Sequence, residues 1–215
     1  MPIPDPSGDP ETTRELVRDR VYLQLRDAII TGVLLPGERL DEAELRTWLQ
    51  VSGTPIRQAL HALSVEGLVQ TAPQSHTAVV APRPEDAQPT LQTIGVLLAG
   101  ATQLTLPHLG DGDRAVLLAH ANEVIARLTT GDVAAITQAA EELFTALLRS
   151  CPNPVLLDVI TRAAPSLSYH VSVAHQGLDA DLADLAAGYK ELSAALSEHD
   201  DRGSVAATKR VFRVG

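Results

Sequence analysis

The sequence is short of cysteine and of aromatic residues, and each shortage excludes a class of protein. Its 215 residues include one cysteine, one tryptophan, three tyrosines and two phenylalanines. Cys151 alone cannot form an intramolecular disulfide or a thiolate metal cluster, and nothing indicates an oxidising compartment. No apolar run is long enough to cross a bilayer, and the first residues lack the basic and apolar regions of a secretory signal. We therefore expect a cytoplasmic protein without membrane association.

Positive charge is also scarce, but it is unevenly distributed. The net charge of −10 argues against non-specific attraction to nucleic acid. Residues 12–82 hold seven arginines against eight acidic residues, whereas residues 83–215 hold ten basic against sixteen acidic residues. The N-terminal part is close to neutral, so its charge permits DNA binding without predicting it.

The hydrophobic pattern predicts helices at the start of the chain. Apolar residues recur at three- and four-residue steps over residues 12–31, which predicts an amphipathic helix that Gly32 can end. Asp41, with Glu44 three residues later, resembles a capping box at the start of a short helix that runs to about Leu49. Both helices have recognisable ends as well as a suitable period.

A third helix and a hairpin complete this N-terminal part. The helix is predicted to start at Thr54, which can cap it, with Pro55 in the first helical position and Gly67 after the last turn. Two short β-favouring runs, at residues 68–71 and 77–81, predict a hairpin. Three helices followed by a hairpin are typical of a winged helix-turn-helix.

The rest of the chain is predicted to be helical. Pro82 and Pro84 mark a linker, and Pro165 is expected to kink or split the fourth later helix. Short connections favour an antiparallel helical bundle, so the predicted fold is mainly α, a winged helix-turn-helix followed by an all-α antiparallel bundle. The expected organisation is a disordered arm at 1–11, a winged helix-turn-helix domain at 12–82, a linker at 83–88 and a helical domain at 89–215, with helices near 87–106, 112–130, 132–150, 154–174, 179–198 and 201–213.

The third predicted helix offers few side chains that can read DNA. A helix-turn-helix places the N-terminus of its second helix in the major groove, where amides meet phosphate and side chains reach base edges. Arg57 can make a bidentate contact to guanine, while Ile56, Leu60 and Leu63 should face the core. An ordinary solvated helix face and a hairpin that closes a small core would give the same pattern. The candidate DNA contacts are Ser52, Gly53, Thr54, Arg57, Gln58 and His61 on the helix, and Gln74, Ser75, His76 and Thr77 at the hairpin tip, which can touch phosphate or enter the minor groove.

The order of these motifs resembles the DNA-binding domain of the GntR family of bacterial transcriptional regulators. The resemblance runs from about residue 21 to residue 82 and rests on VYLQLRDAIITGVLLPGERLDEAEL, VSGTPIRQALHALSVEGLVQ and AVVAP, in that order. It implies a double-stranded DNA operator as partner, contacted by Ser52, Thr54 and Arg57, with His76 and Thr77 at the wing tip.

Two positions depart from the pattern of that family. Gly53 stands where the family usually has an arginine, and Thr77 stands where it usually has a glycine. We therefore expect DNA binding with an altered or weakened sequence preference.

The helical part resembles the FCD-type effector domain of the FadR-like subfamily. The resemblance rests on LFTALLRSCPNPVLLDVI and YKELSAALSEHDDRGSVAATKRVF, and it implies dimerisation, a small-molecule effector and, in many members, a metal held by an aspartate and three histidines. Aligned on NPVLL, those four positions fall on Ala140, Phe144, Tyr189 and Val211, and a shift of one residue moves the first two to Glu141 and Thr145. At most one ligand survives, so we expect no metal and no other cofactor.

The replaced ligands leave three alternatives open for the interior of the helical domain. It can hold a small organic effector, it can be a packed core without a ligand, or other histidines can form a relocated metal site. Arginines can also clamp an acidic effector, although each fits a solvated helix face. The candidates for the effector pocket are Phe144, Tyr189, His120 and His170, those for a relocated metal site are His108, His120, His170, His175 and His199, and the arginines are Arg127, Arg149 and Arg162.

No motif supports catalysis. The sequence lacks a glycine-rich phosphate loop, a Gly-x-Ser-x-Gly elbow and a His-Glu-x-x-His motif, and Cys151 has no evident base as partner. We expect a non-enzymatic bacterial transcriptional regulator, a repressor that binds a pseudo-palindromic operator as a homodimer and responds to a small molecule. The alternative is a helical ligand-binding or interaction protein whose winged domain has lost operator reading.

Overall fold

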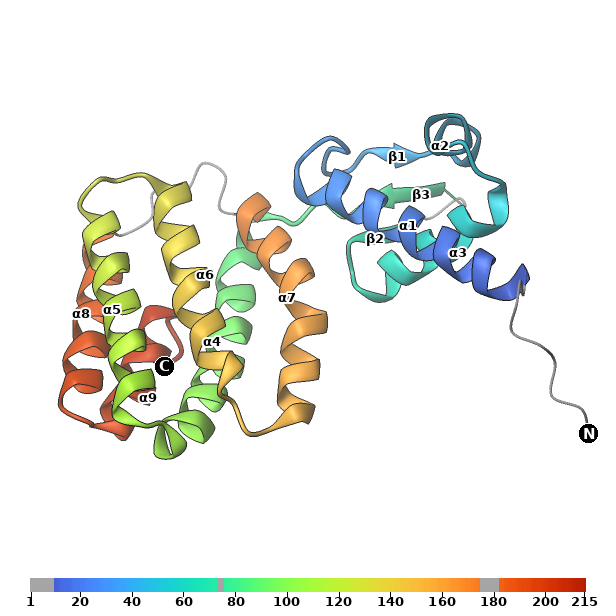
Figure 1. Ribbon diagram of the computed structural model, residues 1–215. Coiled ribbons are helices and arrows are strands. Elements are labelled where there is room, and N and C mark those ends of the chain that lie inside the picture. Colours follow the sequence, from blue (N-terminus) through green and yellow to red (C-terminus); the bar gives the residue numbers. More distant parts are fainter. Residues whose placement is uncertain (1–9, 73–75, 175–181) are drawn as a thin grey trace, which may run out of the picture. The chain divides into compact units, whose positions relative to one another are not determined.

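The computed structural model describes residues 10–72, 76–174 and 182–215, which belong to two compact units (Figure 1). The N-terminal unit comprises residues 1–82 together with residues 168–173, and the helical unit comprises residues 83–167 and 174–215. Within the described ranges the chain forms nine α-helices, two short 3-10 helices and one three-stranded sheet. The predicted fold class, a winged helix-turn-helix followed by a helical bundle, is confirmed.

Helix α1 (Pro10–Ile30) contributes an apolar stripe to the core of the N-terminal unit. Val21 and Leu25 are fully buried and Ile29 nearly so, as their four-residue spacing predicts. Gly32 follows the helix with a φ of +76°, a left-handed conformation that glycine adopts without a steric penalty. The predicted end of the first helix is therefore confirmed.

Helices α2 (Glu42–Leu49) and α3 (Gly53–Val65) form the helix-turn-helix. Asp41 caps α2, because its Oδ1 accepts hydrogen bonds from the backbone N–H groups of Ala43 at 2.8 Å and Glu44 at 3.2 Å. At the other end of the motif, Gly67 has a φ of +78° just beyond α3. The cap of α2 and the stop after α3 are confirmed.

The start of α3 differs from the prediction. Ser52, not Thr54, occupies the N-cap, and Pro55 is the third helical residue rather than the first. Proline fits there because the first N–H groups of a helix have no intrahelical partner, so Pro55 removes no hydrogen bond from the helix. The sequence located the proline in the first turn but placed the boundary two residues too late.

The wing is a small antiparallel sheet with the strand order β1-β3-β2. Strands β2 (Val69–Ala72) and β3 (His76–Val79) form the predicted hairpin. Strand β1 (Arg39–Leu40) pairs with β3 and was not predicted, because two residues are too few to show an alternating pattern.

The N-terminal unit also includes part of helix α7 (Pro154–Ala174). Tyr169 is buried in the core of this unit, its Oη donates a hydrogen bond to the carbonyl oxygen of Val80 at 2.7 Å, and burial raises its pKa to about 12. The Nε2 of His170 lies 3.0 Å from the carbonyl oxygen of Gly67. Helix α7 runs through Pro165 without interruption, so the proline does not split it.

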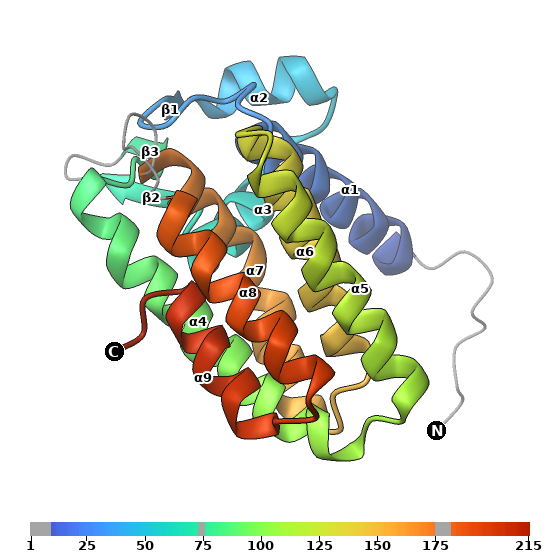
Figure 2. The same cartoon turned by 90° about the vertical axis from the view of Figure 1, so that its left-hand side faces the viewer.

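The helical unit is an antiparallel bundle (Figures 1 and 2). Helices α8 and α9 pack together, as do α5 and α6, α5 and α8, and α4 and α9. A 3-10 turn precedes α4 within the predicted linker, and a second one follows α4. Besides α7, the elements are η1 (Pro84–Asp86), α4 (Ala87–Thr105), η2 (Leu106–His108), α5 (Asp111–Leu128), α6 (Val133–Arg149), α8 (Leu182–Ser197) and α9 (Asp201–Val211).

Small residues let the helices of the bundle approach closely. A Cβ added to Gly95 of α4 would lie 2.4 Å from the Cβ of Phe212, and one added to Gly188 of α8 would lie 3.0 Å from a methyl group of Val211. The rings of Phe144 and Phe212 pack with centroids 5.4 Å apart. The C-terminal segment is thus packed tightly against the bundle.

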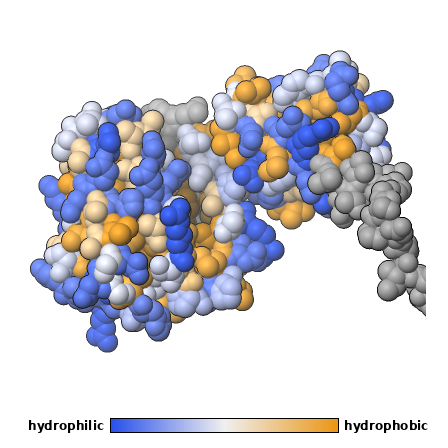
Figure 3. All heavy atoms as spheres, in the orientation of Figure 1, coloured by the Kyte–Doolittle hydropathy of each residue, from blue (hydrophilic) through white to orange (hydrophobic). Residues whose placement is uncertain are grey.

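The surface carries hydrophobic residues only in scattered positions on the side shown in Figure 3. No helix among the described residues is long and apolar enough to span a membrane.

Candidate nucleic-acid interface

Helix α3 has one buried and one exposed face. Ile56, Leu60 and Leu63 are buried, as predicted. The candidate DNA contacts on the opposite face are all exposed except Gly53, which is half-buried; the exposed ones are Ser52, Thr54, Arg57, Gln58 and His61. The helix therefore presents a continuous polar surface.

The N-terminus of α3 is open to an anionic partner. Ser52 is extended and exposed, and its side chain makes no cap hydrogen bond. The first turn contains no acidic residue. Free amides and the positive end of the helix dipole attract phosphate at such a terminus.

Arg57 is held by an acidic neighbour from the other helix of the motif. Its Nη1 donates a hydrogen bond to Oε2 of Glu42 at 3.0 Å, and both side chains are solvent-exposed. Exposed ion pairs contribute only about 0–1 kcal/mol, so DNA phosphates and bases can compete for the guanidinium. The pair was not predicted from the sequence, because 15 positions separate its members.

Gly53 is the first residue of α3, and its backbone does not require glycine. Its φ lies outside the left-handed region that Gly32 and Gly67 occupy. A Cβ at this position would lie 3.0 Å from Nη1 of Arg57 and 3.8 Å from Cδ of Arg46. The space beside Gly53 is thus occupied by two arginine side chains, which excludes the simple explanation that glycine is needed for the turn.

The wing residues lie in different parts of the hairpin. His76 and Thr77 are half-buried in β3, where they pair with Ala72 and Thr71 across the hairpin, and Thr77 also pairs with β1. They belong to the strand rather than to the turn. Gln74 and Ser75 lie outside the described residues.

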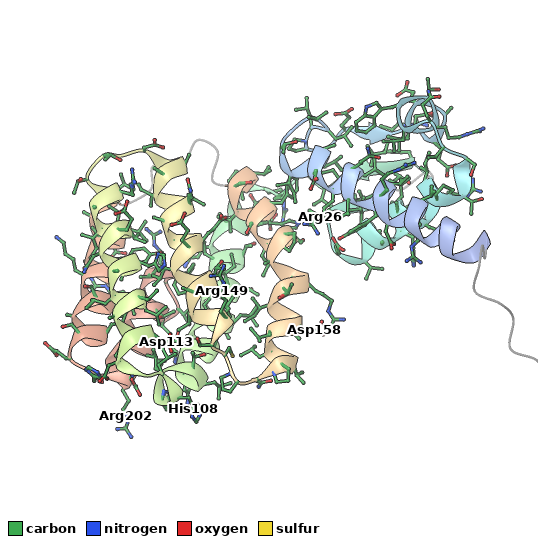
Figure 4. The ribbon with its side chains drawn as sticks, viewed as in Figure 1. Arg26, His108, Asp113, Arg149, Asp158 and Arg202 are labelled. Atoms are coloured by element: carbon green, nitrogen blue, oxygen red, sulfur yellow. The ribbon has the colours of Figure 1, made fainter. Side chains whose placement is uncertain are left out.

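A polar cluster that sequence reasoning missed supports the C-terminal end of α3. Tyr22 of α1 donates a hydrogen bond to Oε1 of Glu66 at 2.5 Å, and Arg26 (Figure 4) lies over the Tyr22 ring with its Cζ 5.9 Å from the centroid. Burial raises the pKa of Tyr22, and Glu66 adds to this effect while Arg26 opposes it. The cluster joins α1 to the end of α3 and so fixes the recognition helix within the unit.

The interior of the helical unit is nearly filled around Phe144. A cavity of about 10 Å³ lies among α4, η2, α5, α6, α8 and α9 and is lined by Phe144 together with Thr102 and Thr208 and several leucines. Tyr189 is buried, which raises its pKa, and His120 is half-buried on α5, but neither lines this cavity. His170 contacts Gly67 in the N-terminal unit instead. The four candidate pocket residues are therefore not brought together.

The positions that hold metal in many FCD domains do not fit a metal in this chain. Phe144, Tyr189 and Val211 are buried and Ala140 packs against the same core, and their side chains offer at most one phenol oxygen. Within the described part of the chain no three His, Cys, Asp or Glu residues gather closely enough to bind a metal ion. The absence of a metal stays a prediction.

The other candidate histidines and arginines that the structure describes in the helical unit have surface positions. His199 lies 3.4 Å from Oδ1 of Asp111, His108 projects from one end of the unit near Arg202 (Figure 4), and His175 is outside the described residues. Arg127 pairs with Glu123 and Arg162 with Asp158 at helical i, i+4 spacing, while Arg149 is exposed. These arginines resemble solvated helix residues more than a clamp for an anionic effector.

The fold and the site define the class of protein: a winged helix-turn-helix domain with an exposed second helix, joined to a helical bundle. Comparison with models of known protein families identifies the family of each part. Residues 17–79 match the bacterial regulatory proteins of the gntR family, and residues 91–214 match the FCD domain. The chain belongs to the GntR family of bacterial regulatory proteins and carries an FCD domain.

Individual relatives agree with this assignment. The chain is 42% identical over 64 residues to an HTH-type transcriptional regulator in an unstable DNA locus of Streptomyces ambofaciens, a match covering 30% of this chain and 27% of that protein. It is 26% identical over 202 residues to the arabinose metabolism transcriptional repressor of Geobacillus stearothermophilus, covering 90% of this chain and 54% of the repressor. The chain thus spans about a quarter and about half of these relatives. A solved GntR regulator from Rhodococcus sp. RHA1 has a TM-score of 0.65 at 25% identity, covering 91% of this chain and 93% of that one.

Proposed function

We propose that this protein is a transcriptional repressor that binds an operator in double-stranded DNA through α3 and the wing. The observation that carries the proposal is the polar face of α3, with an uncapped N-terminus and an exposed Arg57 held only by a surface ion pair. Ser52 and Thr54 contact phosphate, Arg57 reads a guanine, and Gln58 and His61 make additional contacts farther along the helix. Such a protein acts on chromosomal DNA and therefore works in the cytoplasm.

A DNA-binding titration tests this proposal. The purified full chain is titrated with the DNA upstream of its own gene and with a scrambled duplex of equal length, at several salt concentrations. We expect preferential binding of the upstream DNA and a loss of affinity as salt rises, because phosphate contacts release counterions. Equal affinity for both duplexes at every salt concentration would contradict operator reading by this chain at that site.

The proposed regulator is a homodimer. Each chain provides one recognition helix, and two half-sites about one helical turn apart require two such helices. Closed two-fold assemblies are also the commonest oligomers of soluble proteins. Sedimentation equilibrium at micromolar concentration should give twice the monomer mass, and a monomer that stays monomeric on a DNA duplex would remove the two-half-site model.

The helical unit is the proposed effector domain. Its cavity of about 10 Å³ has room for at most about one water molecule, so an organic effector must open the bundle, for example by displacing Phe144. The lining is apolar apart from two threonine hydroxyls, which favours a small and mostly apolar molecule. An effector acts on DNA binding only by binding the DNA-competent and incompetent states with different affinities.

Ligand screening by thermal unfolding tests the effector domain. A small apolar ligand that binds the folded state should raise the unfolding temperature with the logarithm of its concentration above Kd. The effect should be stronger in Phe144→Ala than in the wild type, because the larger cavity needs no opening. A ligand that stabilises both proteins equally would indicate a site elsewhere, and the absence of any ligand for either protein would favour the packed-core alternative.

The alternative function keeps support from two observations. Gly53 provides no side chain at the start of the recognition helix, and Glu42 neutralises Arg57. A protein with these features and no sequence preference in the titration above would be a helical ligand-binding or interaction protein whose winged domain no longer reads DNA.

A further inference from the structure

Two arginines from different helices converge at the first residue of α3. Arg57 comes from α3 itself, and Arg46 lies in the last turn of α2. If Gly53 carried a Cβ, that atom would lie 3.0 Å from Nη1 of Arg57 and 3.8 Å from Cδ of Arg46. The aliphatic stem of Arg46 therefore passes beside the position where a side chain of residue 53 would begin, which brings the guanidinium within reach of the start of α3.

The two arginines differ in their partners. Arg57 is bound to Glu42. Arg46 is exposed, and it forms no ion pair within the described part of the chain. Arg57 must therefore break an ion pair to reach a ligand, whereas Arg46 has none to break among the described residues.

The backbone conformation at residue 53 does not require glycine, so the two neighbouring arginine side chains explain why a residue without a side chain stands there. Because residue 53 is not in the left-handed region, an L-amino acid could adopt its conformation, and the observed consequence of glycine is space. A side chain there would compete with the guanidinium of Arg57 and the stem of Arg46. The stem of Arg46 therefore occupies part of the space that a side chain at position 53 would fill.

We infer that Arg46 is a specificity-determining residue of the DNA interface, which supplies from α2 the base-reading guanidinium that Gly53 cannot supply from α3. The ligand is a guanine edge in the major groove of B-form DNA, whose N7 and O6 accept two hydrogen bonds from arginine. The N-terminal end of a recognition helix is the part that approaches base edges, and this is where Arg46 lies. The inference rests on the proposed function, because it needs a winged domain that reads DNA.

The test measures sequence preference in four proteins. The wild-type chain first selects a duplex from a random pool. The ratio of its affinities for this duplex and for a scrambled one is then compared in Arg46→Ala, in Arg46→Ala/Gly53→Arg and in Arg202→Ala. Arg202 projects from one end of the helical unit (Figure 4), outside the winged domain, and is a control for the loss of one positive charge. Circular dichroism melts verify that each variant is folded.

We expect Arg46→Ala to lower the preference about twentyfold or more, because even a weak guanine contact is worth about fivefold and a dimer makes it twice. The double variant should recover most of this loss, because an arginine at position 53 enters the volume that Arg46 has left. Arg202→Ala should keep the wild-type preference.

Two results would overturn the inference while leaving operator reading intact. The first is an Arg46→Ala variant with the wild-type preference. The second is an equal loss on both duplexes, with a salt dependence lowered by about two counterions, one per subunit, which would assign Arg46 to a phosphate. A wild-type chain that selects no duplex removes the proposed function itself and the inference with it.

Discussion

At the scale of single residues, the proposed DNA interface is characterised by the ion pairs that its charged side chains form in the free protein. The ion pair of Glu42 with Arg57 is solvent-exposed, and such pairs are weak. It holds the arginine away from other partners and adds a negative charge where phosphates approach. We therefore expect Glu42 to lower the affinity of the proposed interface for DNA.

Glu42→Gln should tighten binding of any duplex by up to about fivefold per subunit, the value of a weak exposed ion pair. Glu44→Gln is the matched control, because Glu44 is exposed in the same first turn of α2 and lacks an ion pair within the described residues. Fluorescence anisotropy titrations compare the two variants. Weaker binding by Glu42→Gln would mean that Glu42 orients Arg57 on the DNA rather than competing for it.

The three tyrosines give the stability of the protein a defined dependence on alkaline pH. Burial raises the pKa of Tyr22, of Tyr169 to about 12, and of Tyr189. The unfolded chain loses phenol protons at about pH 10, whereas the folded chain keeps them to higher pH. The stabilisation is therefore complete below about pH 10 and is lost as pH rises through the folded-state values.

Urea unfolding should show a midpoint that is unaffected by the tyrosines at about pH 8 and that falls above about pH 10. The ultraviolet absorbance of tyrosinate in the folded protein should rise at a higher pH than in urea. If folded and unfolded protein titrate together, the three phenols are not buried as described.

At the scale of elements, helix contacts depend on where glycine is placed. Helix α4 contains two glycines with opposite surroundings. A Cβ at Gly95 would lie 2.4 Å from Phe212 and 2.7 Å from Val214, whereas a Cβ at Gly100 would meet nothing within 4 Å. One glycine permits the C-terminal segment to approach α4, and the other only weakens the helix.

Gly95→Ala should destabilise the protein by about 1–3 kcal/mol, because the added methyl overpacks the contact. Gly100→Ala should stabilise it by about 0.5–1 kcal/mol through helix propensity. Denaturant unfolding of both variants measures the difference. Equal effects of the two substitutions would show that the C-terminal segment does not pack on α4 in this way.

Elements with a strong local signal were predictable from the sequence. The apolar spacing in α1 and α3 and the glycines after them predicted the buried faces and the helix ends, because these depend on residues close in sequence. Strand β1 and the burial of Tyr169 in the N-terminal unit were missed, since both depend on partners far along the chain. The exposed face of α3 was predictable. The Glu42–Arg57 pair and the approach of Arg46 to Gly53 were not, because they depend on how α2 packs against α3.

At the scale of the whole molecule, charge is divided between its two parts. The segment 12–82 is nearly neutral, and the net charge of −10 comes mostly from the rest of the chain. A negative molecule gains little from non-specific attraction to DNA. On the proposed function, binding comes from specific contacts at α3 and the wing, so sequence preference, rather than affinity, is the property that tests the proposal.

The most direct test of that claim is the preference of wild-type and Arg57→Ala proteins for a selected duplex over a scrambled one, at fixed salt. We expect a clear preference in the wild type that falls about twentyfold or more in Arg57→Ala, because the dimer loses two guanine contacts. Arg202→Ala should retain the wild-type value. If Arg57→Ala keeps the wild-type preference, or if the wild type has none, α3 does not read an operator in the way described.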